Sequence, residues 1–230
     1  MEHCRYLKGQ VLEAGLCPLE STKTVNMTQV HNITQPTLAD ALLNTYATKS
    51  RALLIDAALI GIFAGFVSLS AQITIPLPFT PVPITGQTLA VLLTGTVIGA
   101  RRGCASLVLY LLLGACGAHV FAGGATGAMK FFGATGGYLL SYPIASAITG
   151  ALAQRGWDRK PAKLFGLMAL GNLAIYVPGV LWLSVFTGSL GSALMKGAVP
   201  FVLGDVVKIG IAMLMMPGAW RLVKRIEREG

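Results

Sequence analysis

The sequence predicts an all-α integral membrane protein with six transmembrane helices, and three observations support this fold class. The chain has 230 residues, of which 54% are hydrophobic and only 12% are charged, whereas soluble domains carry about 25% charged residues. After Arg51 the sequence contains six apolar stretches that can cross a bilayer once tilt is allowed for. Positively charged residues fall in alternate connections between these stretches, as they do in multi-pass membrane proteins.

The first 48 residues form a polar segment that differs from the rest of the chain. Charged side chains such as Glu13 and Lys23, with many Thr, Asn and Gln residues, leave no apolar stretch that could cross a membrane. The segment also lacks the short apolar core and the cleavage site of a secretory signal. We predict a poorly ordered extension over residues 1–48, with a short helix near Leu38–Tyr46, and a membrane domain over residues 49–230.

Six apolar stretches are the expected transmembrane helices. The second and third are short, but Arg101 and Arg102 stand between them and favour two helices over one long helix. In chain order the stretches are Leu53–Ala71, Thr88–Ala100, Gly103–Cys116, Gly137–Ala153, Leu164–Phe186 and Pro200–Trp220.

The distribution of positive charge predicts the orientation of these helices. With the N-terminus inside, the cytoplasmic segments from Lys49 onward hold twelve Lys and Arg residues, whereas the three outer connections hold only Lys130 and Lys196. This positive-inside bias predicts that both termini lie in the cytoplasm. It also explains the net charge of +9, so we expect no nucleic-acid partner.

Two of the outer connections have compositions that predict a binding pocket. The segment Gln72–Gln87 contains four prolines, which fix φ and remove backbone donors, so we expect a rigid, extended loop. The segment Gly114–Gly137 contains eight glycines in 24 residues and allows sharp bends and close backbone approaches. Non-helical backbone at membrane depth is tolerated where it is buried in protein or lines a cavity. We therefore predict a pocket that opens to the outside.

A pair of charges in the last apolar stretch is the strongest candidate for a functional site. Asp205 and Lys208 lie three residues apart in Pro200–Met216, which is otherwise apolar or small, so both side chains share one helix face. A charge at the centre of a bilayer costs about 2.5–3.5 kcal/mol on insertion scales. The pair therefore either binds a polar ligand or forms a structural ion pair between helices.

A stripe of small residues on the first expected helix is a candidate for helix packing. Ala57, Gly61 and Gly65 recur every four residues, a spacing that lets helices approach closely in lipid. The pattern fits packing inside the bundle and packing against another protein equally well.

Four motifs follow one another along the chain: PVPITGQTL at Pro81–Leu89, LVLYLLLGACGAHVFAGG at Leu107–Gly124, GATGGYLLSYPIA at Gly133–Ala145 and GDVVK at Gly204–Lys208. In this order they resemble the motifs of the BioY family, the biotin-specific S component of energy-coupling factor transporters. The resemblance covers about residues 52–226. Two positions depart from the family pattern, since His119 and Ala134 stand where proline is usual, and this predicts a looser second loop.

The resemblance implies a six-helix S-component bundle in the cell membrane that captures biotin from outside. Its partners would be a transmembrane coupling subunit, met by the stripe Ala57, Gly61 and Gly65, and two cytoplasmic ATPase subunits. Asp205 would accept a ureido N–H of biotin, and Lys208 would donate to the ureido carbonyl or to the carboxylate. Trp182 and Phe121 would pack on the ring of biotin. The full expected biotin site is Asp205, Lys208, Tyr138, Asn172, Gln87, Tyr110, Tyr176, Phe121, Gly123 and Gly124.

The sequence favours a binding protein over an enzyme. No nucleophile–base pair, metal-ligand spacing or nucleotide-binding GxxxxGK[ST] motif is evident, so we expect no catalytic residue, metal or cofactor, and any ATPase must be another chain. One alternative is a self-sufficient secondary transporter in which Asp205 carries a coupling proton. Another is a membrane enzyme or assembly factor in which Asp205 and Lys208 are purely structural.

Overall fold

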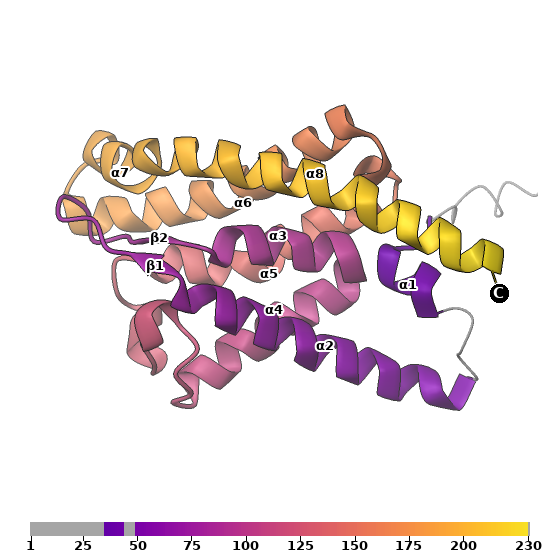
Figure 1. Cartoon of the computed structure of the whole chain (residues 1–230). Coiled ribbons are helices and arrows are strands. Elements are labelled where there is room, and N and C mark those ends of the chain that lie inside the picture. The colour runs from indigo at the N-terminus through magenta and orange to yellow at the C-terminus, as the bar shows by residue number, and fades with distance from the viewer. Residues whose placement is uncertain (1–34, 44–48, 230) are drawn as a thin grey trace, which may run out of the picture. The chain divides into compact units, whose positions relative to one another are not determined.

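The computed structural model describes residues 35–43 and 49–229, except for the side chains of residues 49–51 and 227–229. The described part is mostly helical, as predicted, with one short hairpin (Figure 1). The α-helices are α1 (Leu38–Leu43), α2 (Lys49–Gln72), α3 (Gln87–Ile98), α4 (Ala100–Ala115), α5 (Gly136–Ala153), α6 (Pro161–Thr187), α7 (Leu190–Gly197) and α8 (Val199–Glu229). The strands are β1 (Thr74–Ile75) and β2 (Ile84–Thr85), and the 3-10 turns are η2 (Ala122–Gly124), η3 (Ala128–Phe131) and η4 (Trp157–Arg159).

The six predicted apolar stretches coincide with α2, α3, α4, α5, α6 and α8. Within the described residues, three helical segments are long and apolar enough to cross a membrane: Ala52–Gln72, Pro161–Thr187 and Leu190–Ile226, the last of which includes α7 and α8. The helix α3 is apolar but only 12 residues long. The chain is therefore a multi-pass membrane protein, whereas the count of six spans and the orientation of the termini stay predictions.

The helices α3, α4 and α5 pack against one another in the middle of the bundle. A Cβ atom added to Gly95 of α3 would lie 2.0 Å from the carbonyl oxygen of Ser146 in α5. Only glycine allows this approach, which is the small-residue packing that membrane helices use in place of large apolar contacts. In the core of the bundle, the large side chains of Leu107, Leu167 and Met168 are fully buried.

The short helix predicted near Leu38–Tyr46 is present as α1, although residues 44–46 lie outside the described part of the chain. Thr37 and Asp40 cap its start: the backbone N–H of each donates to the side chain of the other, both at 3.2 Å. Arg102 of α4 pairs with Asp40 and, at 2.8 Å, with Asp56 of α2. Residues 35–43, assigned to the extension by the prediction, thus pack on the bundle.

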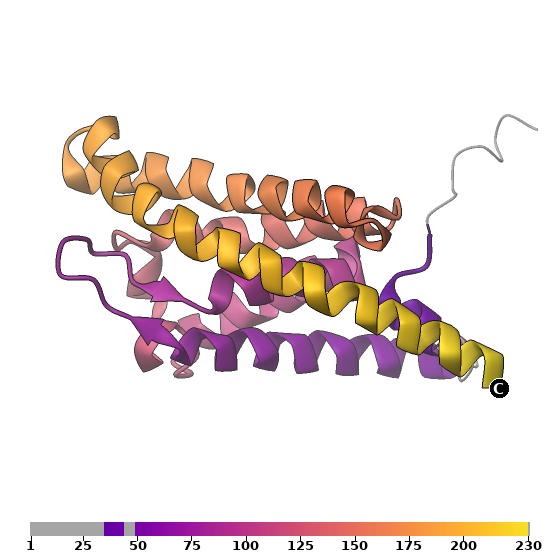
Figure 2. The same cartoon turned by 45° about the horizontal axis from the view of Figure 1, so that its top comes forward.

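The hairpin, the loop over residues 116–135 and α7 lie at one end of the bundle, here called the hairpin end, opposite α1 and the C-terminal part of α8 (Figures 1 and 2). Thr74 and Ile75 pair antiparallel with Thr85 and Ile84, and the four prolines lie in the turn between them, so this segment is not helical, as predicted. Thr80 Oγ1 donates to the Lys196 carbonyl at 2.8 Å and ties the hairpin to α7.

Candidate functional site

A cavity of about 380 Å³ lies at the hairpin end of the bundle. This volume lies within the range of small-molecule sites. The hairpin and the loop over residues 116–135 supply part of its wall, and α3, α5, α6, α7 and α8 supply the rest. The polar side chains in its lining are Thr74, Thr80, Thr85, Gln87, Thr88, Lys130, Thr135, Tyr138, Tyr142, Tyr176, Asp205 and Lys208.

Asp205 and Lys208 form a polar cluster in this cavity. The Tyr176 hydroxyl donates to Asp205 Oδ2, and Lys208 Nζ donates to Asp205 Oδ1 at 3.3 Å. Lys208 Nζ also donates to Thr88 Oγ1 at 2.7 Å. The Asp205 residue is only 5% exposed, so its charge is stabilised by these donors and its cationic neighbour, with little help from solvent.

Three helices bring this cluster together. The i, i+3 spacing on α8 places Asp205 and Lys208 on one face, as the sequence predicts. Tyr176 comes from the middle of α6, and Thr88 from the first turn of α3. The exposed neighbours Val206 and Val207 point the other way, so α8 presents a charged face to the cavity and an apolar face outward.

An aromatic wall closes another side of the cavity. Phe121 is 2% exposed and meets Tyr110 and Phe131 edge to face, with ring centroids 5.6 and 5.8 Å away. A Cβ atom on Gly114 would lie 2.1 Å from the Phe121 ring, so only glycine at position 114 leaves room for this ring. The amide of Gln87, which lines the cavity, donates to the hydroxyl of Tyr110, which does not. Tyr110 thus supports the lining instead of forming it.

Two tyrosines of α5 complete the lining. Tyr138 and Tyr142 lie one helical turn apart, and both line the cavity. The Tyr138 hydroxyl donates to the Gly197 carbonyl of α7 at 2.9 Å. Its ring therefore offers the cavity an apolar surface while its polar atom holds α7 in place.

The structure brings six of the ten predicted site residues into the cavity lining: Asp205, Lys208, Tyr138, Gln87, Tyr176 and Phe121. Tyr110 lies behind that lining. Asn172 of α6 is buried elsewhere, and Gly123 and Gly124 are outside the lining. Both glycines have positive φ, 66° and 74°, and shape the loop. Trp182, expected on the ligand ring, instead donates from Nε1 to the Gly133 carbonyl at 2.9 Å and does not line the cavity.

Sequence reasoning missed seven polar lining residues: Thr74, Thr80, Thr85, Thr88, Lys130, Thr135 and Tyr142. Thr88 directly follows Gln87 in the PVPITGQTL motif, and Tyr142 follows Tyr138 at helical spacing. The patterns that identified Gln87 and Tyr138 could therefore also have identified Thr88 and Tyr142. Lys130 was counted only as an outer positive charge, yet it lines the cavity.

The cavity is chemically suited to hold a small molecule that is polar at one end and apolar in its body. It offers a carboxylate acceptor and an ammonium donor side by side, with aromatic and proline surfaces around them. Among the described residues, no group of three or more His, Cys, Asp or Glu side chains could hold a metal ion.

The stripe of Ala57, Gly61 and Gly65 faces away from the bundle. All three residues are exposed, and a Cβ atom on either glycine would meet nothing within 4 Å. The side of α2 that packs inward is instead formed by Ala64, Val67 and Ala71. The stripe therefore makes no close helix contact within the described residues.

Three comparisons relate this chain to known proteins. Residues 40–225 match the family model described as "BioY family". The chain is 38% identical over 160 residues to "Probable biotin transporter BioY" of Pyrococcus horikoshii, covering 70% of this chain and 93% of the relative. It is 37% identical over 169 residues to "Biotin transporter BioY" of Thermotoga maritima, covering 74% and 95%.

A solved structure shares the fold. It is the crystal structure of the S-component for biotin from an ECF-type ABC transporter, with a TM-score of 0.65 and 23% sequence identity. The match covers 80% of this chain and 96% of that chain.

Proposed function

The chain belongs to the BioY family, a family of transporters and not of enzymes, and from this premise we propose that it captures biotin in the cavity at the hairpin end. The observation that carries the proposal is the pair of buried Asp205 and half-buried Lys208, which lines a cavity of suitable size. A purely structural ion pair has no need of such a cavity.

The chemistry of biotin matches the two kinds of surface in this cavity. Its ureido group has two N–H donors and one carbonyl, which suit the Asp205 carboxylate and the donors Lys208 and Thr88. Its thiophane ring and valeryl chain are apolar and suit the rings of Phe121 and Tyr138. The ureido group would therefore take the place of solvent at the polar cluster.

We also propose the membrane arrangement that the charges predict: six spans in the cell membrane, with both termini in the cytoplasm and the hairpin end outside. The helix α3 is roughly 18 Å long at 1.5 Å per residue, short of the roughly 30 Å hydrocarbon core. The hairpin before it would complete the crossing, which is tolerated because this backbone lines the cavity.

Uptake would require an energy-coupling partner. The exposed stripe on α2 gives a transmembrane coupling subunit a surface that backbone atoms can approach closely. The chain has no GxxxxGK[ST] motif, so two cytoplasmic ATPase subunits would supply the energy.

Titration calorimetry on the purified chain in detergent tests the capture function. We expect saturable binding of biotin and none of riboflavin. Asp205→Asn should weaken biotin binding roughly 10- to 100-fold, because a hydrogen bond to a charged group contributes about 1.5–3 kcal/mol. Thermal unfolding of the variant must show that it still folds. Unchanged affinity in folded Asp205→Asn would remove the assigned role.

Uptake into proteoliposomes tests the coupling. Gly65→Leu should leave biotin binding intact but reduce ATP-driven uptake with the coupling subunit and ATPases. Gly218→Leu is the matched control, because this glycine of α8 is also exposed with nothing within 4 Å of its Cβ position. Uptake by the chain alone that collapses with an uncoupler would instead favour a secondary transporter.

A further inference from the structure

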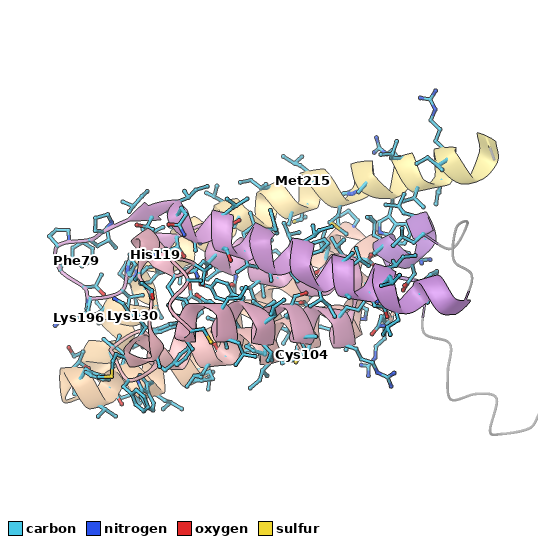
Figure 3. All side chains as sticks on the ribbon, turned by 90° about the horizontal axis from the view of Figure 1, so that it is seen from below. Phe79, Cys104, His119, Lys130, Lys196 and Met215 are labelled. Atoms are coloured by element: carbon cyan, nitrogen blue, oxygen red, sulfur yellow. The ribbon has the colours of Figure 1, made fainter. Side chains whose placement is uncertain are left out.

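The cavity lining holds a second positive charge besides Lys208. Lys130 lies in η3, within the loop that forms part of the wall, and its exposed side chain lines the cavity. Figure 3 shows Lys130 at the same end as Phe79 of the hairpin and Lys196 of α7. The cavity therefore has a lysine at its exposed rim as well as one in the buried polar cluster.

These two lysines differ in the hydrogen-bond and ionic partners that their Nζ atoms already have. Lys208 Nζ has an anionic partner in Asp205 and a further acceptor in Thr88. Within the described residues, Lys130 Nζ forms neither a hydrogen bond nor an ion pair. A ligand carboxylate beside Lys208 would also meet the negative charge of Asp205, whereas beside Lys130 it would meet no such repulsion.

The surroundings of Lys130 are free of negative charge. The sequence contains no Asp or Glu between Asp56 and Asp158, and only Asp205 between Asp158 and Glu227. The hairpin, the loop over residues 116–135 and α7 therefore carry no carboxylate side chain. The rim of the cavity therefore offers an approaching anion a positive charge at Lys130 and no negative charge, an arrangement that favours association of anions.

We propose that Lys130 is a specificity-determining residue that receives the carboxylate of the ligand at the rim, while the ureido group lies at Asp205, Lys208 and Thr88. This inference rests on the proposed biotin function and adds an orientation to it: ureido inward, carboxylate outward. It assigns Lys208 to the ureido carbonyl and not to the carboxylate.

Binding of biotin and of its neutral amide, biotinamide, to the full chain tests the orientation. The wild type should prefer biotin. Lys130→Gln should weaken biotin about two- to fivefold, as expected for an exposed ion pair, and leave biotinamide unchanged. The loss should appear in the association rate and be smaller at about 500 mM salt than at about 50 mM salt. Lys196→Gln, a change of the same kind on α7, should keep the preference.

Two results would overturn the assignment. Equal weakening of biotin and biotinamide by Lys130→Gln would show a general effect on the loop and no role for charge. An undiminished preference for biotin in that variant would place the carboxylate elsewhere. A wild type that binds neither ligand would overturn the proposed function itself, and this inference with it, so the two failures are distinct.

Discussion

Asp205 and Asp158 are both buried carboxylates that accept a hydrogen bond from an aromatic side chain, yet they have different roles in the molecule. Asp205 is 5% exposed and accepts from the Tyr176 hydroxyl. Asp158 of η4 is 2% exposed and accepts from Trp220 Nε1 at 2.8 Å. Burial and an aromatic partner thus do not by themselves distinguish a binding site from a structural contact.

The second oxygen of each carboxylate makes the difference. Asp205 Oδ1 faces Lys208 and a cavity, where a ligand can compete for it. Asp158 Oδ1 is buried without a hydrogen-bond partner among the described residues and lies outside that cavity. Burial raises the pKa of the Asp158 carboxyl, and the Trp220 hydrogen bond offsets this only in part. Protonation would remove the charge that burial leaves poorly stabilised, which suits a structural contact between η4 and α8.

Removal of the Asp205 counter-ion should have the largest effect on binding. Lys208→Met leaves a buried carboxylate with Tyr176 as its remaining partner, and loss of one charged hydrogen-bond donor weakens a ligand by roughly 10- to 100-fold. Titration calorimetry with biotin measures this change. Arg159→Met, which removes a cation 4.5 Å from the Trp220 ring at the other end, is the control and should leave affinity unchanged. Equal affinity losses in both variants would contradict a division between binding and structural clusters.

Loss of the hydrogen bond from Trp220 to Asp158 should lower stability and leave biotin binding unchanged. Trp220→Phe leaves Asp158 without its one side-chain hydrogen bond, and an unsatisfied buried acceptor costs about 1–3 kcal/mol. Thermal unfolding in detergent should show a lower Tm, with biotin affinity unchanged. A fall in affinity without a fall in Tm would mean that the η4–α8 contact acts on the binding site.

The smallest expected effect is the pH dependence of stability that arises from Asp158. Because the folded-state pKa of Asp158 is raised, its contribution to stability is fully present below the unfolded pKa of about 3.8 and is lost as pH rises through the folded value. Asp158→Asn mimics the protonated form, so it should be more stable than wild type at pH 7, by about 1 kcal/mol or less, with the gain shrinking toward pH 4.

Asp40 provides a control of opposite sign for this pH dependence. Burial raises the pKa of Asp40, but hydrogen bonds from Arg102 and Thr37 outweigh it and leave the pKa lowered. The contribution of Asp40 to stability is therefore present above the unfolded pKa of 3.8 and is lost as pH falls through the folded-state pKa. Asp40→Asn should lower Tm at pH 7. A stability difference between Asp158→Asn and wild type that does not vary with pH would refute the raised pKa.

Much of the site was predictable because its main signals are local in sequence. The i, i+3 spacing of Asp205 and Lys208 and the proline-rich and glycine-rich segments each depend on residues close along the chain. The errors arise where a side chain could point in several directions. Trp182 lies on the same helix as Tyr176, but its indole donates to the Gly133 carbonyl instead of lining the cavity. Nothing in the sequence around Trp182 distinguishes these outcomes.

The sequence by itself determined that the chain is a helical membrane protein, where its helices lie, and that one helix carries a charged pair. Insertion of a helix depends on its own composition, so these properties can be read one segment at a time. Only the tertiary structure decided that Tyr176 and Thr88 reach that pair, that Tyr110 lies behind the cavity lining, and that the α2 stripe faces outward. These contacts depend on the rotation of each helix about its axis, which is set by packing against distant segments.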